Sequence, residues 1–167
     1  MVTIEGRKWN FSIWGFLGIL ILAMAVPVAN AQTPFDVTEC GSGTFTMVFQ
    51  SPEVTVSGLE GKGIFFSSHE NKVLNNCTFQ VVQIARVIGT NRVANSYWKI
   101  MDADGDAIVA SVDVVGGEKT MTFMHGTGKW KGIKGGAKGK GDTAGKFIAP
   151  GTFQTCTRYV GSFELPK

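Results

Sequence analysis

The chain has 167 residues, a length typical of one domain. Its 16 lysines and arginines face 13 aspartates and glutamates, which gives a formal net charge of +3. A charge so close to balance does not by itself indicate a nucleic acid or another polyanion as partner.

The first 31 residues have the three parts of a secretory signal peptide. Arg7 and Lys8 form a basic start, residues 11–26 form an apolar run without charge, and Ala29-Asn30-Ala31 offers small residues at the positions that signal peptidase recognises. We therefore predict a signal peptide over residues 1–31 and a mature domain over residues 32–167.

A membrane anchor is the alternative for this segment, since its apolar run approaches the roughly 18–20 residues that span a bilayer. Pro27 and the small-residue cleavage site favour removal. No second apolar run of that length follows, so we expect a periplasmic or secreted protein without a membrane span once the signal is removed.

Three cysteines remain in the mature domain, Cys40, Cys77 and Cys156. An oxidising compartment favours one disulfide and one remaining thiol. A disulfide between Cys40 and Cys156 would join the two ends of the domain, and in the chain-entropy model it would stabilise the fold by roughly 4–5 kcal/mol. The pairing of Cys40 with Cys77 stays open.

After Ala31 the chain consists of short β-branched and aromatic runs separated by Gly, Asp, Asn and Ser, a pattern typical of strands. Asp104-Gly105 and Gly116-Gly117 lie between such runs and favour tight hairpins, because glycine accepts a positive φ. The predicted strands, in chain order, cover residues 43–49, 53–57, 63–67, 78–88, 96–102, 107–114, 119–124, 137–142, 152–157 and 159–165.

So many strands without a helix to cover a sheet predict an all-β domain, either a sandwich or a closed, mostly antiparallel β-barrel. We favour the barrel, because closure removes exposed strand edges. About 135 residues would bury about two-thirds of the unfolded surface, enough for one core.

Residues 125–142 are rich in glycine and lysine. Gly126-Thr127-Gly128-Lys129 resembles a phosphate-binding loop only superficially, since Trp130 stands where Ser or Thr is required and no helix follows. We interpret the segment as a tight connection followed by a strand in which glycines give curvature and lysines face water. A lysine surface over residues 129–146 that binds anionic envelope polymers stays open, whereas nucleic acid is disfavoured by the predicted export.

The same segment carries a resemblance to a known family. Gly126-Thr127-Gly128-Lys129-Trp130 and Gly132-Ile133-Lys134-Gly135 resemble the G-T-G-x-aromatic-x-G-[IA]-x-G element of the allene oxide cyclase/dirigent-like barrel superfamily. Residues 102–106, Asp-Ala-Asp-Gly-Asp, are similar to an Asp-rich hairpin in exported bacterial members. The resemblance implies a calycin-like barrel of about eight strands with a central cavity. It implies no particular activity, because none of the cyclase's substrate-handling positions can be matched.

The chain lacks the sequence patterns of common catalytic and metal sites. Asp102, Asp104 and Asp106 stand at positions 1, 3 and 5 of an EF-hand loop, but Gly105 falls at position 4 instead of 6 and Asp113 replaces the glutamate of position 12. They fit a solvated acidic hairpin, with a calcium site as the alternative. His69 and His125 are the only histidines and have no metal-ligand spacing. We therefore expect no cofactor and no metal.

The leading hypothesis is an exported β-barrel, not an enzyme, that binds a small apolar molecule in its interior. An isomerase or cyclase acting on a hydrophobic substrate is the alternative, since such chemistry needs little beyond a shaped cavity and one carboxylate. A homo-oligomer is left open. The residues predicted to contact the ligand are Trp98, His125, Trp130 and Tyr159.

Overall fold

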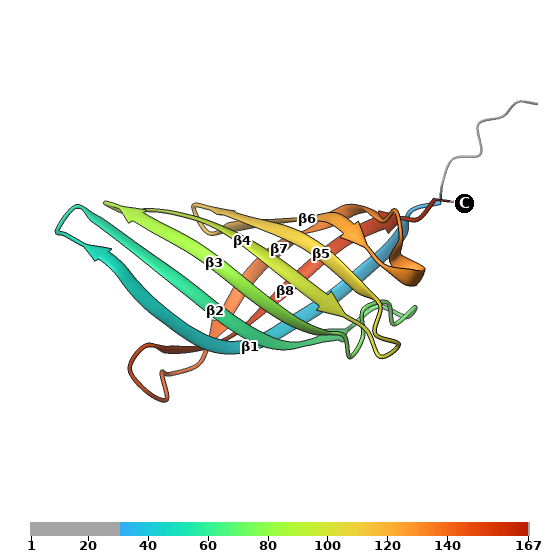
Figure 1. The fold of residues 1–167 in the computed structure, drawn as a ribbon, viewed down its shortest axis with the longest axis horizontal. Helices are drawn as coiled ribbons and strands as arrows, with labels where there is room; N and C mark the ends of the chain where they lie inside the picture. Colours follow the sequence, from blue (N-terminus) through green and yellow to red (C-terminus); the bar gives the residue numbers. More distant parts are fainter. Residues whose placement is uncertain (1–30, 167) are drawn as a thin grey trace, which may run out of the picture.

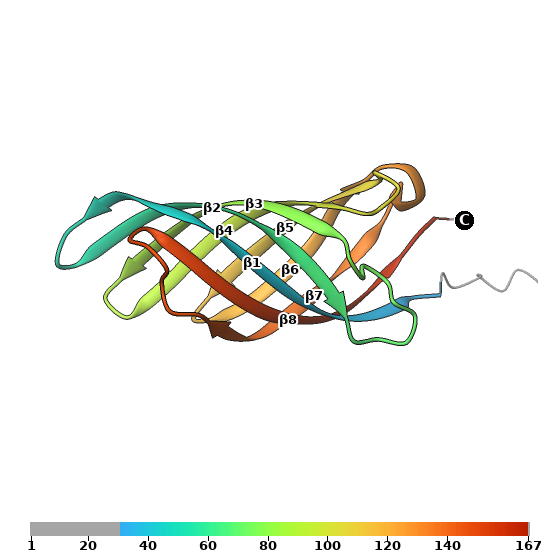
Figure 2. The same cartoon turned by 90° about the horizontal axis from the view of Figure 1, so that it is seen from below.

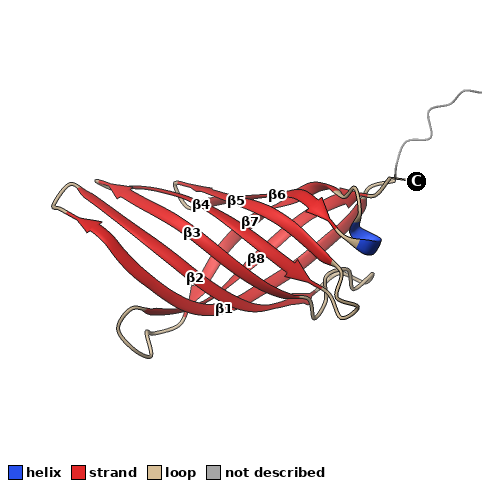
Figure 3. Cartoon of the chain, viewed as in Figure 1, coloured by secondary structure: helices blue, strands red, loops and turns tan. Residues whose placement is uncertain are grey.

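A computed structural model describes residues 31–166, and the predicted signal peptide lies outside them apart from Ala31. Eight strands and one 3-10 turn make up the ordered elements of this part of the chain (Figures 1 and 3). Within it, no helix has the length and apolar character needed to cross a membrane. The elements are β1 (Thr33–Gln50), β2 (Val54–Ser67), β3 (Thr78–Ile88), β4 (Asn91–Met101), β5 (Ala107–Val115), β6 (Glu118–Gly126), η1 (Gly128–Trp130), β7 (Lys134–Ala144) and β8 (Thr152–Glu164).

Each strand pairs antiparallel with its neighbours in sequence, and β1 also pairs with β8, so the sheet closes on itself. Figure 2 shows the resulting tilted barrel from a second direction. The predicted all-β class and the closed antiparallel barrel are confirmed. Closure leaves no unpaired edge strand, which is the physical reason for preferring a barrel to a sandwich.

The structure differs from the predicted strands in three main places. The predicted strands 53–57 and 63–67 belong to one strand, β2, the predicted strands 152–157 and 159–165 belong to one strand, β8, and β1 begins at Thr33, ten residues before the predicted start. In β2 the glycines between the two runs are typical of a break. They instead permit the strand to continue through a sharp bend.

Four glycines form that bend in the barrel wall. Gly41 lies opposite Gly63 and Gly43 lies opposite Gly61 in the β1–β2 ladder. A Cβ atom on Gly63 would collide with the Cys40 carbonyl oxygen, and one on Gly43 would collide with the Glu60 carbonyl oxygen. The two strands therefore approach at this corner only because both lack side chains there.

The two ends of the barrel differ. The connections β1–β2, β3–β4, β5–β6 and β7–β8 lie at one end, which we call the open end, at the left of Figure 1. The other connections and both ends of the described chain lie at the opposite, closed end (Figure 1). Packed side chains fill the closed end, among them Phe35, Leu74, Trp130, Ile133 and Phe163.

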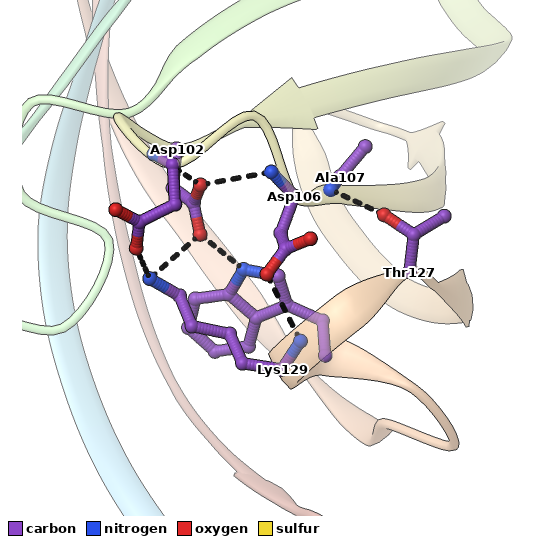
Figure 4. Close-up of polar contacts among 7 residues, drawn as sticks. Asp102, Asp106, Ala107, Thr127 and Lys129 are labelled. Carbon is purple, nitrogen blue, oxygen red and sulfur yellow. Dashed lines mark hydrogen bonds and ion pairs between the residues drawn. The ribbon is translucent and has the colours of Figure 1, made fainter.

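Asp102 fixes the closed end by joining the β4–β5 hairpin to η1 (Figure 4). Its Oδ1 atom accepts hydrogen bonds from the backbone N–H groups of Asp104 and Asp106 at 2.9 and 3.0 Å. Its Oδ2 atom accepts one from Trp130 Nε1 at 2.8 Å and lies 2.9 Å from Lys129 Nζ. Burial opposes ionisation, but the hydrogen bonds from Lys129 and Trp130 hold the pKa of Asp102 below its usual value.

The Asp-rich hairpin is thus a structural junction in which each of the three carboxylates has at least one bonded oxygen. Asp106 Oδ2 accepts a hydrogen bond from the Lys129 backbone N–H at 3.0 Å, and Lys129 Nζ donates to Asp104 Oδ2 at 2.6 Å. Across the part of the chain that the structure describes, no group of three or more His, Cys, Asp or Glu is arranged to hold a metal ion.

The Asp102→Ala substitution is expected to lower the free energy of unfolding by about 2 kcal/mol, because it leaves the Trp130 indole and two backbone N–H groups without their acceptor. The Asp102 side chain is 7% exposed, whereas that of Asp104 is 72% exposed. The matched control, Asp104→Ala, is therefore expected to change the free energy of unfolding by less than about 0.5 kcal/mol. Urea unfolding of both variants tests this, and equal losses would contradict the assigned role of Asp102.

Candidate functional site

A cavity of about 380 Å³ lies inside the open half of the barrel. Alternate residues of each strand point inward, and in this half they leave space between opposite walls. The volume falls within the range of small-molecule pockets, roughly 300–1,000 Å³. The apolar lining comes from β1 to β4, β8 and the β7–β8 connection, and comprises Phe45, Leu59, Phe79, Val81, Trp98, Phe147 and Phe153.

A polar group forms one side of this cavity. Glu39 from β1 and Asp142 from β7 both line it, and Glu39 is only 4% exposed. Lys119 Nζ donates to Thr157 Oγ1 at 2.8 Å and pairs with Asp142 Oδ1, to which Thr157 also donates. Glu39 lies directly opposite Thr157 in the β1–β8 ladder. We call Glu39, Lys119, Asp142 and Thr157 the polar quartet.

The two carboxyl groups of the polar quartet differ in their protonation. Burial raises the pKa of Glu39 to about 7, and the neighbouring Asp142 adds to this rise, while Lys119 opposes it. Burial acts on Asp142 too, but hydrogen bonds from Lys119 and Thr157 hold its pKa below the usual value. Near neutral pH one carboxyl group can therefore give or take a proton while the other stays ionised, a division of roles found in acid–base sites.

Trp98 is the predicted ligand residue that the structure places in the cavity wall. Its Nε1 atom donates to Ser96 Oγ at 2.9 Å, and that hydroxyl donates to the Val112 carbonyl oxygen at 3.1 Å, so the indole ring has a fixed orientation. Tyr159 is fully buried, with its ring centroid 6.4 Å from that of Trp98, and packs in the core beside the cavity.

The structure places the other two predicted ligand residues away from the cavity. The register of the β5–β6 ladder shifts between Phe123, which pairs with Ala110, and His125, which pairs with Val109. This irregularity turns His125 to the outer face of the barrel, where it is exposed. Trp130 lies at the closed end in the junction with Asp102, with its ring 5.6 Å from that of Phe163. A ligand inside the open half would meet Trp98 and not these two.

Sequence reasoning missed Glu39, Lys119 and Asp142. The predicted strands do not include residues 33–42, so the prediction does not place Phe35, Val37 and Glu39 on one face of a strand, where they lie in β1. In β7 the chain bulges between Lys140 and Asp142, and Gly141 there has a φ of +64°. Strict alternation would have put Asp142 outside; the bulge turns it inward.

A larger hollow of about 770 Å³ lies against the outer wall of β1 to β4. Its polar lining comes from outward-facing residues such as Glu60, Lys62, Gln80 and Lys99. We regard the smaller interior cavity as the candidate site, because it encloses a ligand between opposite walls and contains buried ionisable groups.

The cysteines also have defined places. Cys40 and Cys156 are directly opposite each other in the β1–β8 ladder and form a disulfide across the seam that closes the barrel. Cys77 is a buried free thiol of the core, and burial raises the pKa of that thiol to about 11. Of the two pairings left open by the sequence, the structure contains Cys40–Cys156.

The barrel matches a solved structure over most of its length. The pterocarpan synthase dirigent protein GePTS1 superposes with a TM-score of 0.54 over 82% of this chain and 93% of its own, at 10% sequence identity. This chain has the dirigent-like barrel fold. The resemblance seen in the glycine-rich element is confirmed at the level of fold, and an identity of 10% shows nothing beyond the fold.

The remaining comparisons add no functional assignment to this dirigent-like barrel. The enduracididine biosynthesis enzyme MppR covers 82% of this chain and 88% of its own at 5% identity, and its TM-score of 0.31 is too low to carry an argument. No family model matches the sequence, and no curated protein matches it.

Proposed function

We propose that this dirigent-like barrel binds a small, largely apolar molecule in the cavity of its open half. The observation that carries the proposal is the cavity itself, with aromatic and aliphatic walls and one polar side. Sites for small molecules have this composition, because apolar walls supply affinity and a few polar groups fix orientation. The disulfide and the signal-like start of the sequence support an exported location, which we include in the proposal.

The binding proposal is tested by titrating the protein with Nile red, a neutral apolar dye that fluoresces when it leaves water. We expect saturable binding by the native chain. The Ser57→Phe variant is expected to weaken this binding at least about tenfold, because Ser57 lines the cavity and a phenyl ring would occupy part of its volume.

Thr122→Phe is the matched control for this experiment. Thr122 is exposed on β6, beyond the lining of the cavity, so the same substitution adds the same apolar ring to the outside. Dye binding equal to the native chain is expected for Thr122→Phe. If Ser57→Phe also bound like the native chain, the interior would not be the binding site.

Glu39 favours a second candidate, acid–base catalysis on a hydrophobic substrate such as an isomerisation or cyclisation. A general acid works best when its pKa lies near the operating pH, and burial raises that of Glu39 to about 7. Thr157 and Asp142 hold Lys119 beside it, so a cation is available to stabilise negative charge on a bound intermediate.

This second candidate is tested with the molecule that the protein retains from its host. Under the catalytic hypothesis the native chain converts it with a rate that falls above about pH 7, where Glu39 loses its proton. The Glu39→Gln variant is expected to bind the molecule and not convert it. Equal conversion by native chain and variant would remove Glu39 as the catalytic acid, and absence of conversion by the native chain would contradict the catalytic hypothesis.

A further inference from the structure

The open end of the barrel carries exposed apolar side chains on all four of its connections. Val48 and Phe49 lie near the β1–β2 tip, Ile88 and Val115 at the β3–β4 and β5–β6 tips, and Phe147 and Ile148 in the β7–β8 connection. These six residues, which we call the rim, are between 52% and 84% exposed. Large apolar side chains at the tips of loops cost free energy in water unless they meet a partner.

Topology places the rim around the mouth of the cavity. The four connections lie at the same end of the barrel, with the β1–β2 hairpin extending furthest (Figures 1 and 2). Phe147 belongs both to the rim and to the cavity lining, and its ring lies 6.2 Å from that of Phe45. The apolar surface is therefore continuous from the rim into the cavity.

The charges beside the rim differ between its connections. Arg86 and Arg92 flank Ile88 at the β3–β4 tip and Lys146 precedes Phe147 in the β7–β8 connection, whereas the acidic residues Glu53, Asp113 and Glu118 lie at the β1–β2 and β5–β6 tips. Across residues 31–166 no carboxylate forms an ion pair with either arginine or with Lys146. The β3–β4 and β7–β8 tips thus combine apolar side chains with unpaired cations, the combination that binds the headgroup region of anionic lipid.

We propose that the rim docks onto the surface of a lipid bilayer that contains anionic lipid, with the open end facing the membrane. A ring of apolar tips around a hollow mouth fits lipid better than a second copy of the barrel, because fluid acyl chains can fill the hollow and a rigid barrel end cannot. Docking would also let an apolar ligand pass between bilayer and cavity without crossing water. Only this last point rests on the proposed function.

Rim insertion is measured with a nitrobenzoxadiazole label, whose fluorescence rises on leaving water. The label is attached to Ile148→Cys at the rim and, as control, to Lys131→Cys, an exposed position at the closed end. Cys40 and Cys156 are in a disulfide and Cys77 is buried, so the label reports the introduced thiol. A position-specific signal also separates rim insertion from any membrane contact made by residues 1–30.

On addition of phosphatidylglycerol–phosphatidylcholine vesicles, we expect a fluorescence increase of about twofold or more at the rim label and none at the control label. No increase at the rim, or equal increases at both positions, would overturn the proposal. The proposal would also be overturned if, without vesicles, the fluorescence of the rim label rose with protein concentration. That result would mean that the rim forms a contact between two copies of the chain.

Substitution of rim residues gives an independent test. Phe49→Ser combined with Ile148→Ser is expected to weaken vesicle binding in sedimentation at least about tenfold. Val160→Ser, which removes a half-exposed apolar side chain from the outer face of β8, is the control and should bind like the native chain. Unchanged binding by the double variant would overturn the proposal. Neither Phe49 nor Ile148 lines the cavity, so Nile red binding by the double variant without vesicles tests the proposed function separately.

Discussion

Replacing Cys40 and Cys156 together by serine is expected to lower the free energy of unfolding of the barrel by about 4 kcal/mol. The two residues are 116 positions apart in sequence and directly opposite in the β1–β8 ladder. The disulfide therefore closes a long loop of the unfolded chain and restricts it strongly, in the chain-entropy model. It also secures the one seam of the barrel that joins the first strand to the last.

Chemical denaturation with and without dithiothreitol checks this expectation. The reductant should bring the native chain down to the stability of the double variant and should leave the double variant unchanged, because Cys77 is a free thiol in both. A loss below about 1 kcal/mol would contradict it and would mean that pairing of β1 with β8 holds the seam without the disulfide.

Glu39 is expected to make the fold less stable as the pH rises from about 5 to about 7. Burial raises its pKa in the folded chain to about 7, from an ordinary value of 4.5. Between these values the folded chain keeps a proton that the unfolded chain has lost, so the stabilisation present at low pH disappears as the pH passes through the folded pKa. A difference of this size corresponds to about 3 kcal/mol.

The Glu39→Gln variant isolates this effect, because glutamine has nearly the same shape and no charge. We expect it to exceed the native chain in stability at pH 8 by about 2–3 kcal/mol and to lack the decline between pH 5 and pH 7. Glu60→Gln removes one exposed carboxylate from the outer face and controls for net charge. Parallel curves for the native chain and Glu39→Gln would show that Glu39 is ionised in the folded protein at neutral pH.

The acidic residues with lowered pKa values act in a different pH range. Burial favours the neutral form of Asp142 and of Asp102, but hydrogen bonds hold the pKa of both carboxyl groups below the ordinary value of 3.8. Their contribution is therefore complete above about pH 4 and is lost only as the pH falls through the lower folded values. A decline in stability between pH 5 and pH 7 is therefore due to Glu39, whose pKa is raised, and not to Asp142 or Asp102.

The sequence predicted the barrel because its strand signals are local. In residues 119–124, Met121 and Phe123 alternate with threonines, and both are buried in β6. Glycine-containing turns at 104–105 and 116–117 mark two hairpins, and all three glycines there have positive φ. Glycine inside strands gave the wrong prediction in β2, since residues 58–62 look like a break and in fact belong to the strand.

The candidate site was harder to predict, because Glu39 lies outside the predicted strands and the facing of His125 and Asp142 depends on irregularities of the ladders. His125 follows Phe123 at the spacing of an inward residue, but the irregularity in β6 turns it outward. Asp142 follows Gly139 at the spacing of an outward residue, but the bulge at Gly141 turns it inward. Bulges reverse the facing of every residue beyond them, and a single sequence does not show where they occur.

Native mass spectrometry of the protein recovered from its own host tests most directly whether the barrel interior holds a small molecule. We expect the native chain to carry an additional mass of a few hundred daltons, roughly the size that a pocket of this volume encloses. The Ser57→Phe variant should have lost that mass, and Thr122→Phe should have kept it. A bare chain in all three preparations, or the same added mass in Ser57→Phe as in the native chain, would contradict the assignment of the cavity as a binding site.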